Sequence, residues 1–375
     1  MTQRLALCVD GRFLAQPLTG VQRYAREWIE TLDALLEAGD PATVGVDAEL
    51  VVPRALVATT PALRRIRVRR GGFGGGHAWE QLSLPLLVGG AILFCPANLA
   101  PLASLATGRP VVVTLHGLSF LERPDSYGPA FRIAYRILTS AALRRADAVL
   151  TVSESERRAL VERCPRASER IHVIPNGASP GAFRRRAGRP SSERRDLLFV
   201  GSLTEGKNLD AAIAALAIVR ERHDLGLVVV GGTGPGLASA RIRIPASCEG
   251  RVEFVGQIEE PERLQEFYER ARCLVFPSRY ESSGLPPTEA MACGCPVVAS
   301  DLPALRERCG EAALYAHPDR ADEFARRILE VIESPARTDE LRSAGLQRAA
   351  ELSWDANVRR SLEVMRSVAA RRLRS

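Results

Sequence analysis

The stretch that decides the fold is Arg279-Tyr-Glu-Ser-Ser-Gly-Leu-Pro-Pro-Thr-Glu-Ala-Met-Ala-Cys-Gly-Cys-Pro-Val-Val-Ala299. Short apolar runs at residues 273–276 and 296–299 flank its loop, and both are typical of buried parallel strands. In open α/β sheets, ligands bind at the loops that follow the carboxyl ends of such strands. Gly284 permits an unusual backbone conformation there, and the two prolines after Leu285 suit the first turn of a helix. The stretch therefore predicts an anion site at the start of a helix.

Two carboxylates frame that turn. Glu281 lies in the loop and Glu289 lies in the helix, with seven residues between them. A carboxylate on the helix can accept hydrogen bonds from a ribose diol, whereas one in the loop can reach a sugar hydroxyl or a developing positive charge. The alternative is a pair of surface glutamates beside a helix start, where glutamate is common.

The same stretch resembles the donor-site signature of the retaining, nucleotide-sugar-dependent group 1 glycosyltransferases, and in particular the bacterial mannosyltransferases. The E-x7-E motif of that family matches Glu281 and Glu289. An aromatic residue often follows the first glutamate by two positions, and this chain has Ser283 there. The other matching segments are Tyr280-Glu281, Gly284-Leu285-Pro286, Glu289-Ala290-Met291-Ala292 and Gly294-Cys295-Pro296-Val297-Val298.

The resemblance implies an α/β protein of GT-B architecture, with two Rossmann-like domains facing across a cleft. We expect an acceptor-binding domain at residues 1–180, a basic linker at 181–196 and a nucleotide-sugar-binding domain at 197–353. The amphipathic segment 354–375 is expected to form a helix that crosses back onto the first domain. A length of 375 residues fits two domains.

Composition indicates a soluble globular protein, with 46% hydrophobic and 25% charged residues. No stretch approaches the roughly 20 apolar residues of a membrane span, and the N-terminal residues lack the pattern of a signal peptide. The eight cysteines show no C-x-x-C or zinc spacing, which favours buried thiols in a reducing compartment. We therefore expect a cytoplasmic protein.

The net charge of +7 comes largely from arginine clusters. Such clusters can hold nucleic acid, anionic lipid or a phosphorylated substrate, or form solvated faces. No aromatic interleaving or nucleic-acid motif accompanies them, so we expect no nucleic-acid partner and a peripheral contact with the anionic inner membrane face. The clusters are Arg64, Arg65, Arg67, Arg69 and Arg70, then Arg184, Arg185, Arg186 and Arg189.

Two positions in the first domain are candidate site residues. Gly20 lies in a loop between a strand at 5–9 and a helix at about 21–36, without the G-x-G-x-x-G fingerprint. The resemblance implies that this loop approaches the donor diphosphate and the acceptor. His116 follows a strand at 111–115, and the resemblance implies that it faces the transferred sugar. It is followed by Gly117, where many relatives carry aspartate, and the alternative is an ordinary loop histidine.

The second domain supplies the expected phosphate grip. Lys207 stands at a helix start beside glycines, which favours a phosphate ligand by charge and by position. The resemblance implies that Lys207 holds the donor diphosphate and that Gly201 and Ser202 line the same loop. An arginine is common where this chain has Ser202, so Arg279 or Arg23 substitutes for it or the grip is weaker, and Arg23 is also consistent with a solvated position. The Gly256 region is expected along the nucleotide base, and the amides of residues 283–285 near the diphosphate.

The sequence thus predicts retaining transfer of a hexose, with mannose from GDP-mannose as the preferred donor, to a glycan or lipid-linked acceptor in cell-surface polysaccharide synthesis such as lipopolysaccharide O-antigen. His116, Lys207 and Glu281 are the predicted catalytic residues. No D-x-D motif occurs, so we expect no metal and no cofactor besides the nucleotide-sugar substrate. The alternatives are a nucleotide-sugar epimerase of the same fold and a non-catalytic sugar-binding protein. The joint presence of Lys207, Glu281 and Glu289 argues against the second, whereas Ser202 and Gly117 argue mildly for it.

Overall fold

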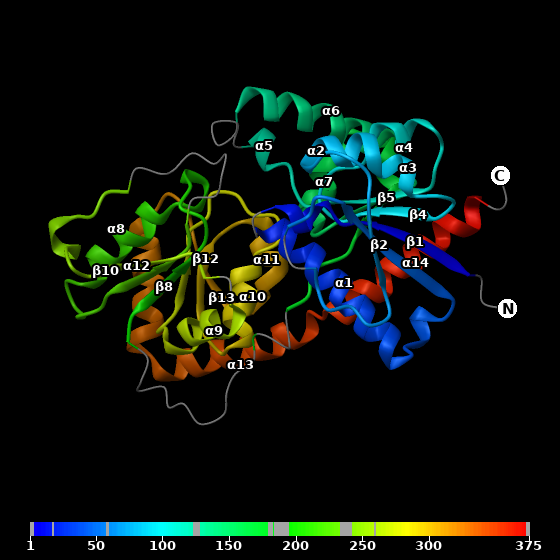
Figure 1. Ribbon diagram of the computed structural model, residues 1–375. Helices are drawn as coiled ribbons and strands as arrows, with labels where there is room; N and C mark the ends of the chain where they lie inside the picture. The colour runs from blue at the N-terminus through cyan, green and yellow to red at the C-terminus, as the bar shows by residue number, and fades with distance from the viewer. Residues whose placement is uncertain are drawn as a thin grey trace. The chain divides into compact units, whose positions relative to one another are not determined.

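The computed structural model describes residues 4–16, 19–57, 60–122, 128–178, 183, 195–232, 242–258 and 260–372 (Figure 1). The chain divides into two units. The first unit comprises Met1–Leu118, Pro129–Gly177 and Trp354–Ser375, and the second comprises Ser119–Gly128 and Ala178–Ser353. Most of the expected basic linker, with its arginine cluster at 184–189, lies outside the described residues.

The first unit is built on a seven-stranded sheet in the order β3-β2-β1-β4-β5-β6-β7, with every neighbouring pair parallel. Its central strands are continuous apolar runs because helices cover both faces of the sheet. The strands are β1 (Leu5–Asp10), β2 (Val46–Pro53), β3 (Arg67–Gly71), β4 (Ile92–Cys95), β5 (Val111–Leu115), β6 (Ala148–Thr151) and β7 (Ile171–Val173).

The helices of the first unit follow the alternation that a parallel sheet requires. Ser153 caps α7, and its Oγ accepts a hydrogen bond from the Glu156 backbone N–H at 3.3 Å. The segment after Gly76 is less regular than a single helix, because it passes from α2 through the π-helix η3 into α3. The elements are η1 (Arg12–Ala15), α1 (Gly20–Ala38), η2 (Pro41–Thr43), α2 (Gly76–Ala78), η3 (Trp79–Ser83), α3 (Leu84–Leu87), α4 (Leu102–Ala106), α6 (Pro129–Arg145), α7 (Glu154–Arg163), η5 (Pro165–Arg170) and α14 (Trp354–Arg372).

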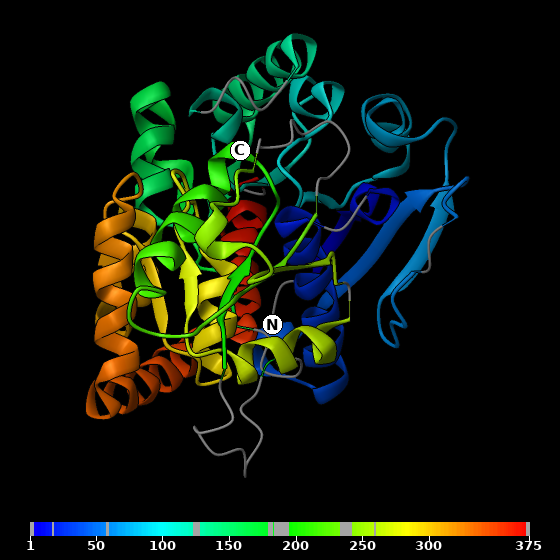
Figure 2. The ribbon, with the colours of Figure 1, turned by 90° about the vertical axis from the view of Figure 1, so that its left-hand side faces the viewer.

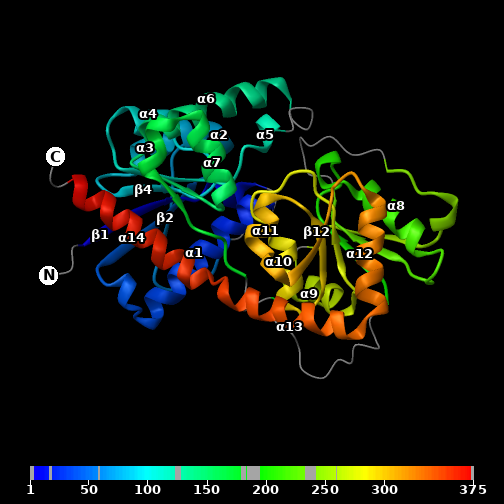
Figure 3. The same cartoon turned by 180° about the vertical axis from the view of Figure 1, so that it is seen from behind.

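The C-terminal helix α14 belongs to the first unit. Figure 3 shows it in red beside the blue helix α1. Its apolar stripe, Val358, Leu362 and Met365, shares a fully buried core with Trp28 and Leu32 of α1. This packing confirms the expectation that the last helix returns to the first domain.

The second unit holds a six-stranded parallel sheet in the order β10-β9-β8-β11-β12-β13, which Figure 2 shows in green to yellow. The strands are β8 (Leu197–Val200), β9 (Leu227–Val230), β10 (Val252–Gly256), β11 (Leu274–Phe276), β12 (Val297–Ser300) and β13 (Ala313–Ala316). The helical elements are α5 (Ser119–Glu122), η7 (Glu205–Lys207), α8 (Leu209–Val219), η8 (Ala246–Cys248), α9 (Pro261–Arg270), α10 (Leu285–Ala292), α11 (Pro303–Cys309), η9 (Gly310–Ala312), α12 (Ala321–Glu333) and α13 (Pro335–Glu351).

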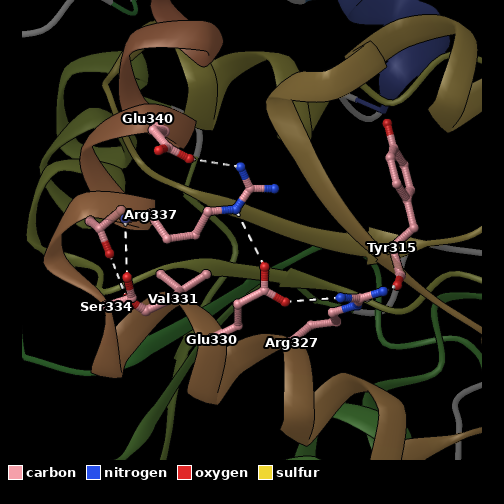
Figure 4. A network of polar contacts seen from close by, with 8 residues as sticks. Tyr315, Arg327, Glu330, Val331, Ser334, Arg337 and Glu340 are labelled. Carbon is pink, nitrogen blue, oxygen red and sulfur yellow. Dashed lines mark hydrogen bonds and ion pairs between the residues drawn. The ribbon is translucent and has the colours of Figure 1, made fainter.

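A polar network fixes the corner between α12 and α13 (Figure 4). Glu330 accepts from Arg327 at 2.9 Å and from Arg337 at 3.3 Å, and Arg337 also reaches Glu340 at 3.0 Å. Ser334 caps α13 through the backbone N–H of Arg337. These side chains are one third to two thirds exposed, so each ion pair contributes little, and the network orients a helix corner rather than forming a site.

The chain leaves and re-enters the first unit at neighbouring points. Ala178 pairs with Ser353 in a parallel bridge, and its N–H donates to the Leu352 carbonyl at 2.7 Å. Within the first unit, Gly177 lies directly against Trp354. A Cβ added to Gly177 would stand 2.3 Å from the backbone nitrogen of Trp354. Only glycine fits this contact.

Within the described ranges, no helix has the length and apolarity needed to span a lipid bilayer.

Candidate active site

The start of α10 is formed by a left-handed residue. Gly284 caps the helix with φ 72° and ψ 54°, a left-handed conformation that is unfavourable for residues with a Cβ. A Cβ at this position would also stand 2.7 Å from Cδ2 of Leu305. Pro286 and Pro287 have no N–H, so among the first three helical residues Leu285 alone carries a donor toward an anion. The predicted helix start is therefore present, but it offers fewer helical amides to an anion than a proline-free turn would.

Lys207 and Glu281 meet at the carboxyl edge of the second sheet. Lys207 ends η7 after β8, Glu281 lies in the loop after β11, and β8 and β11 are neighbours in the sheet. Lys207 Nζ donates to Glu281 Oε2 at 2.6 Å, with side-chain exposed fractions of 27% and 12%. The ammonium also lies 5.3 Å from the centroid of the Phe276 ring. The structure thus joins two predicted catalytic residues in one half-buried ion pair.

Asn208 and Arg279 hold the loops that carry this pair. Asn208 is left-handed, with φ 59°, and its side-chain amide donates to the Pro277 carbonyl at 3.0 Å and the Pro318 carbonyl at 2.7 Å. Arg279 donates from its guanidinium to Asp319 at 2.8 Å and to a backbone carbonyl of η7 at 3.0 Å. The guanidinium of Arg279 therefore braces the loops, which is a different role from the phosphate contact considered for it.

Glu289 is buried on α10, with 3% of the residue exposed. The Tyr268 hydroxyl, from α9, donates to Glu289 Oε2 at 2.8 Å. The preceding residue, Thr288, donates to the Gly284 carbonyl at 3.1 Å and accepts from Arg308 Nε at 2.7 Å. Burial lowers the pKa of the Arg308 guanidinium to about 10, and the guanidinium is still charged at neutral pH. A buried cation and a buried carboxylate therefore support the first turns of α10.

The remaining predicted donor residues also lie near the carboxyl ends of strands in this sheet. Gly201 follows β8 and faces Gly231, where an added Cβ would stand 1.8 Å from the Gly201 carbonyl oxygen. Ser202 comes next, with its hydroxyl 3.4 Å from that of a neighbouring threonine. Gly256 ends β10 with φ 84°, and a Cβ there would meet open space. Ser283 is buried directly before Gly284. The sheet topology thus gathers the second-unit candidates on one edge.

His116 and Gly20 lie in the first unit. His116 is 7% exposed, its Nε2 lies 2.7 Å from the Pro96 carbonyl oxygen, and its backbone N–H donates to Asn98 Oδ1 at 2.7 Å. The ring of Tyr24 stands edge-on to it, with centroids 4.4 Å apart. Burial lowers the pKa of the imidazole from 6.5 to about 4. His116 is therefore neutral near pH 7, with a proton on Nε2 to donate to Pro96 and an acceptor lone pair on Nδ1.

Gly20 begins α1, and a Cβ added there would meet no atom within 4 Å. Packing within the chain therefore does not require glycine at this position. A close approach by a bound molecule, as the resemblance implies, would require it.

Sequence reasoning missed a buried ionic cluster beside His116. Arg12 lies 3.1 Å from Glu80, its backbone N–H donates to Asp10 at 2.9 Å, and its Nη2 donates to the Ala97 carbonyl at 3.2 Å. All three charged residues are at most 1% exposed. Burial, with the nearby charge of Glu80, raises the pKa of Asp10 to about 8. The signal that could have found the cluster is the pair Asp10 and Arg12, which lies at the carboxyl end of the buried strand β1.

The structure also changes the reading of the first arginine cluster. Glu49 pairs with Arg67 and with Arg69, each at 2.8 Å, and Glu37 pairs with Arg64 at 2.7 Å. Much of the positive charge predicted for this surface is therefore neutralised by neighbouring carboxylates. Within the part of the chain that the structure describes, no three His, Cys, Asp or Glu side chains gather as a metal site.

Two family models match the chain, Glycosyl transferases group 1 over residues 194–334 and Glycosyltransferase Family 4 over residues 90–181. The O-antigen chain mannosyltransferase RfbU of Salmonella typhimurium is 27% identical over 68% of this chain and 69% of its own length. A D-inositol 3-phosphate glycosyltransferase of Thermobispora bispora is 31% identical over 70% and 66%. An alpha-maltose-1-phosphate synthase of Mycolicibacterium smegmatis is 30% identical over 72% and 76%.

Solved structures show the same fold over almost the whole chain. A sucrose-phosphate synthase from Thermosynechococcus elongatus matches with a TM-score of 0.73 at 22% identity, covering 98% of this chain and all of its own. Anabaena Alr3699/HepE, in complex with UDP and glucose, matches with a TM-score of 0.68 at 17% identity, covering 97% of this chain and all of its own. These likenesses establish the fold as GT-B.

Proposed function

Because this chain belongs to the group 1 glycosyltransferases, we propose that it transfers a hexosyl group, with retention of configuration, from a nucleoside diphosphate sugar to a glycan or lipid-linked acceptor. The preferred donor is GDP-mannose, which the likeness to an O-antigen chain mannosyltransferase supports. The competing donor is UDP-glucose, since a structural neighbour binds UDP and glucose. The proposed setting is synthesis of a cell-surface polysaccharide such as an O-antigen, at the cytoplasmic face of the membrane.

The observation that carries the proposal is the Lys207–Glu281 pair beside the start of α10. A diphosphate brought to this edge offers Lys207 more negative charge than Glu281 does. As the bond to the sugar breaks, charge develops on the leaving diphosphate, and a fixed ammonium stabilises it more strongly in the transition state than in the ground state. Lys207, with the amides of Gly284 and Leu285, is the proposed source of that stabilisation.

Glu289 and Glu281 divide the remaining recognition in this proposal. Glu289, already held by Tyr268, accepts hydrogen bonds from the ribose diol. Glu281, released from Lys207 when the diphosphate binds, contacts the transferred sugar. No further carboxylate is assigned as a covalent nucleophile, and the departing diphosphate takes the proton of the acceptor hydroxyl. The proposal includes no metal ion, because Lys207 and the start of α10 supply positive charge at the diphosphate.

His116 acts in this scheme as a neutral hydrogen-bonding group. With its Nε2 proton directed to Pro96, the free lone pair on Nδ1 can accept from a sugar hydroxyl. The low pKa argues against a role as a general acid near pH 7.

A thermal-shift panel of GDP, UDP, ADP, GDP-mannose and UDP-glucose tests the donor assignment. A ligand at about 100 times its Kd adds about 2.7 kcal/mol to the stability, enough for a shift of several degrees. Lys207→Ala is the matched control and should lose most of the shift. NMR of the product made from the stabilising donor then gives the anomeric configuration. Conversion of the donor without acceptor would favour an epimerase, and ligand binding without any product would favour a non-catalytic protein.

A further inference from the structure

Helix α6 presents apolar side chains to solvent. Ile133 is 62% exposed, Ile137 is 56% exposed and Phe131 is 36% exposed. The buried residues of α6 are all in its second half, at Thr139 and beyond. Large apolar side chains in such a cluster on a helix surface indicate an interaction site.

The charge of α6 is entirely of one sign. Its 17 residues, Pro129–Arg145, include four arginines and no aspartate or glutamate. Arg132 and Arg136 are exposed, and among the described residues no carboxylate forms an ion pair with either. Arg67 and Arg69 differ in this respect, because each pairs with Glu49. The exposed Arg132 and Arg136 of α6 therefore carry positive charge that no described carboxylate pairs with.

The spacing of these residues separates an apolar stripe from a basic stripe. Ile133 and Ile137 are four residues apart and share one side of the helix, and Arg132 and Arg136 share the side next to it. The rings of Phe131 and Tyr135 stack with their centroids 3.9 Å apart. Tyr135 also lies edge-on to His77 of α2, so this pair of rings is on the side of α6 opposite the isoleucines. Arginines beside exposed isoleucines are the arrangement of a helix that lies in a membrane interface.

Exposed leucines also occur on the elements next to α6. Helix α4 contacts both α6 and η3, and η3 leads into α3. Figure 1 shows these helices grouped together. Leu102 of α4 is 42% exposed, Leu82 of η3 is 59% exposed and Leu86 of α3 is 77% exposed.

We propose that the α6 face, defined by Arg132, Ile133, Arg136 and Ile137, docks the protein on an anionic lipid surface. Ile133 and Ile137 enter the acyl boundary, and Arg132 and Arg136 bind lipid phosphates. The commitment to lipid rests on charge complementarity, since α6 offers four cations and no anion around an apolar stripe. This inference rests on the proposed function, because docking would bring the protein to the membrane surface where a lipid-linked acceptor lies.

Vesicle co-sedimentation of the full chain tests the docking. Vesicles of pure phosphatidylcholine are compared with vesicles in which about 30% of the lipid is anionic phosphatidylglycerol. Wild-type protein should bind the anionic vesicles at least about tenfold more tightly than the neutral ones. Ile133→Gln with Ile137→Gln should lower that binding at least about tenfold, because two apolar side chains no longer insert. Arg132→Gln with Arg136→Gln should lower it by about fivefold for each arginine.

Two matched control variants make the same kinds of substitution outside α6, so they show whether the location of the changed residues matters. Ile244→Gln with Phe254→Gln removes two exposed apolar side chains of the second unit, which are 40% and 44% exposed, and should bind as wild type. Arg64→Gln with Arg67→Gln changes the net charge from +7 to +5, as the α6 arginine variant does, and should also bind nearly as wild type. All variants should keep the wild-type thermal shift with nucleotide, so failure of the docking is distinguishable from failure of the donor site.

Three results would overturn the docking. Wild-type protein that ignores anionic vesicles would refute it, and so would α6 variants that bind as their matched controls do. The third is a wild-type dimer, measured by light scattering, that the isoleucine variant converts to monomer without a loss of vesicle binding. That result would assign the face to a second copy of the chain.

Discussion

The two glutamates of the E-x7-E motif should separate in a nucleotide-binding experiment. Glu289→Gln replaces a buried carboxylate, held by Tyr268 at 2.8 Å, with a neutral amide. Hydrogen bonds to a charged acceptor contribute about 1.5–3 kcal/mol. The loss for a ribose diol is therefore expected at about 1–3 kcal/mol, which corresponds to a Kd for the bare nucleoside diphosphate about 5- to 150-fold weaker.

Glu281→Gln should leave the affinity for the bare nucleoside diphosphate unchanged or raise it. In the free protein Glu281 neutralises Lys207 at 2.6 Å, and the side chains are 12% and 27% exposed. A pair that water still reaches contributes about 1 kcal/mol or less. Removing the carboxylate charge frees Lys207 for the diphosphate, so the Kd should stay constant or improve by up to about fivefold. The cost should appear in kcat with the full nucleotide-sugar, because the proposed role of Glu281 is to contact the transferred sugar.

Isothermal titration calorimetry of wild type and both variants with the nucleoside diphosphate that stabilises the protein decides between these outcomes. Tyr268→Phe is a useful third variant, because it removes the hydroxyl that holds Glu289 and should weaken the nucleotide in the same direction as Glu289→Gln. If Glu281→Gln loses nucleotide affinity while Glu289→Gln keeps it, the assignment of the two carboxylates is wrong.

Three further predictions concern single positions. Lys207→Ala should lower transfer at least about tenfold, roughly 1.4 kcal/mol, because the charge-assisted contact to the leaving diphosphate is lost; unchanged steady-state kinetics would contradict the phosphate role. Gly284→Ala should cost about 1–2 kcal/mol of stability and also weaken the nucleotide, since φ is 72° and the new Cβ would stand 2.7 Å from Leu305; a wild-type melting curve would refute this. His116 has a folded pKa of about 4 against 6.5 unfolded, so the unfolded chain takes up the proton first and the free energy of unfolding should fall as the pH drops from 6.5 to about 4. Denaturant titrations at pH 7.5 and 4.5 should show this fall in the free energy of unfolding for wild type and a smaller fall for His116→Gln. An equal fall in both proteins would argue against a buried neutral imidazole.

Much of the fold could be predicted because its strands are short apolar runs bounded by polar or small residues. The strand β5 begins and ends where the sequence places it. The strand β13 was missed, since two of the four residues in Ala313-Leu-Tyr-Ala316 are alanines, which have weak strand preference. Its position is set by pairing with β12, which is a tertiary contact that local pattern does not encode.

The candidate site could be predicted as a set of residues but not as a set of contacts. Lys207, Glu281 and Gly284 stand out by motif and by their place after strands. The contact between Lys207 and Glu281 spans 74 positions of sequence and depends on β8 lying beside β11. Tyr268 gives no sequence signal, because a tyrosine on the buried side of an amphipathic helix resembles any core residue. Packing order decides both contacts, and a single sequence does not show it.

The pairing of Ala178 with Ser353 has a consequence for how proteins of this kind can be altered. The long segment of the second unit begins and ends at one place, so in the covalent chain it is an insertion into the first unit. Segments whose ends adjoin can be exchanged as one piece without rerouting the rest of the chain. Grafting residues 178–353 of a relative between Gly177 and Trp354 would exchange the long segment of the second unit, which holds the proposed donor site. The recipient's α14 and its core would stay covalently intact, provided that the glycine against Trp354 is kept.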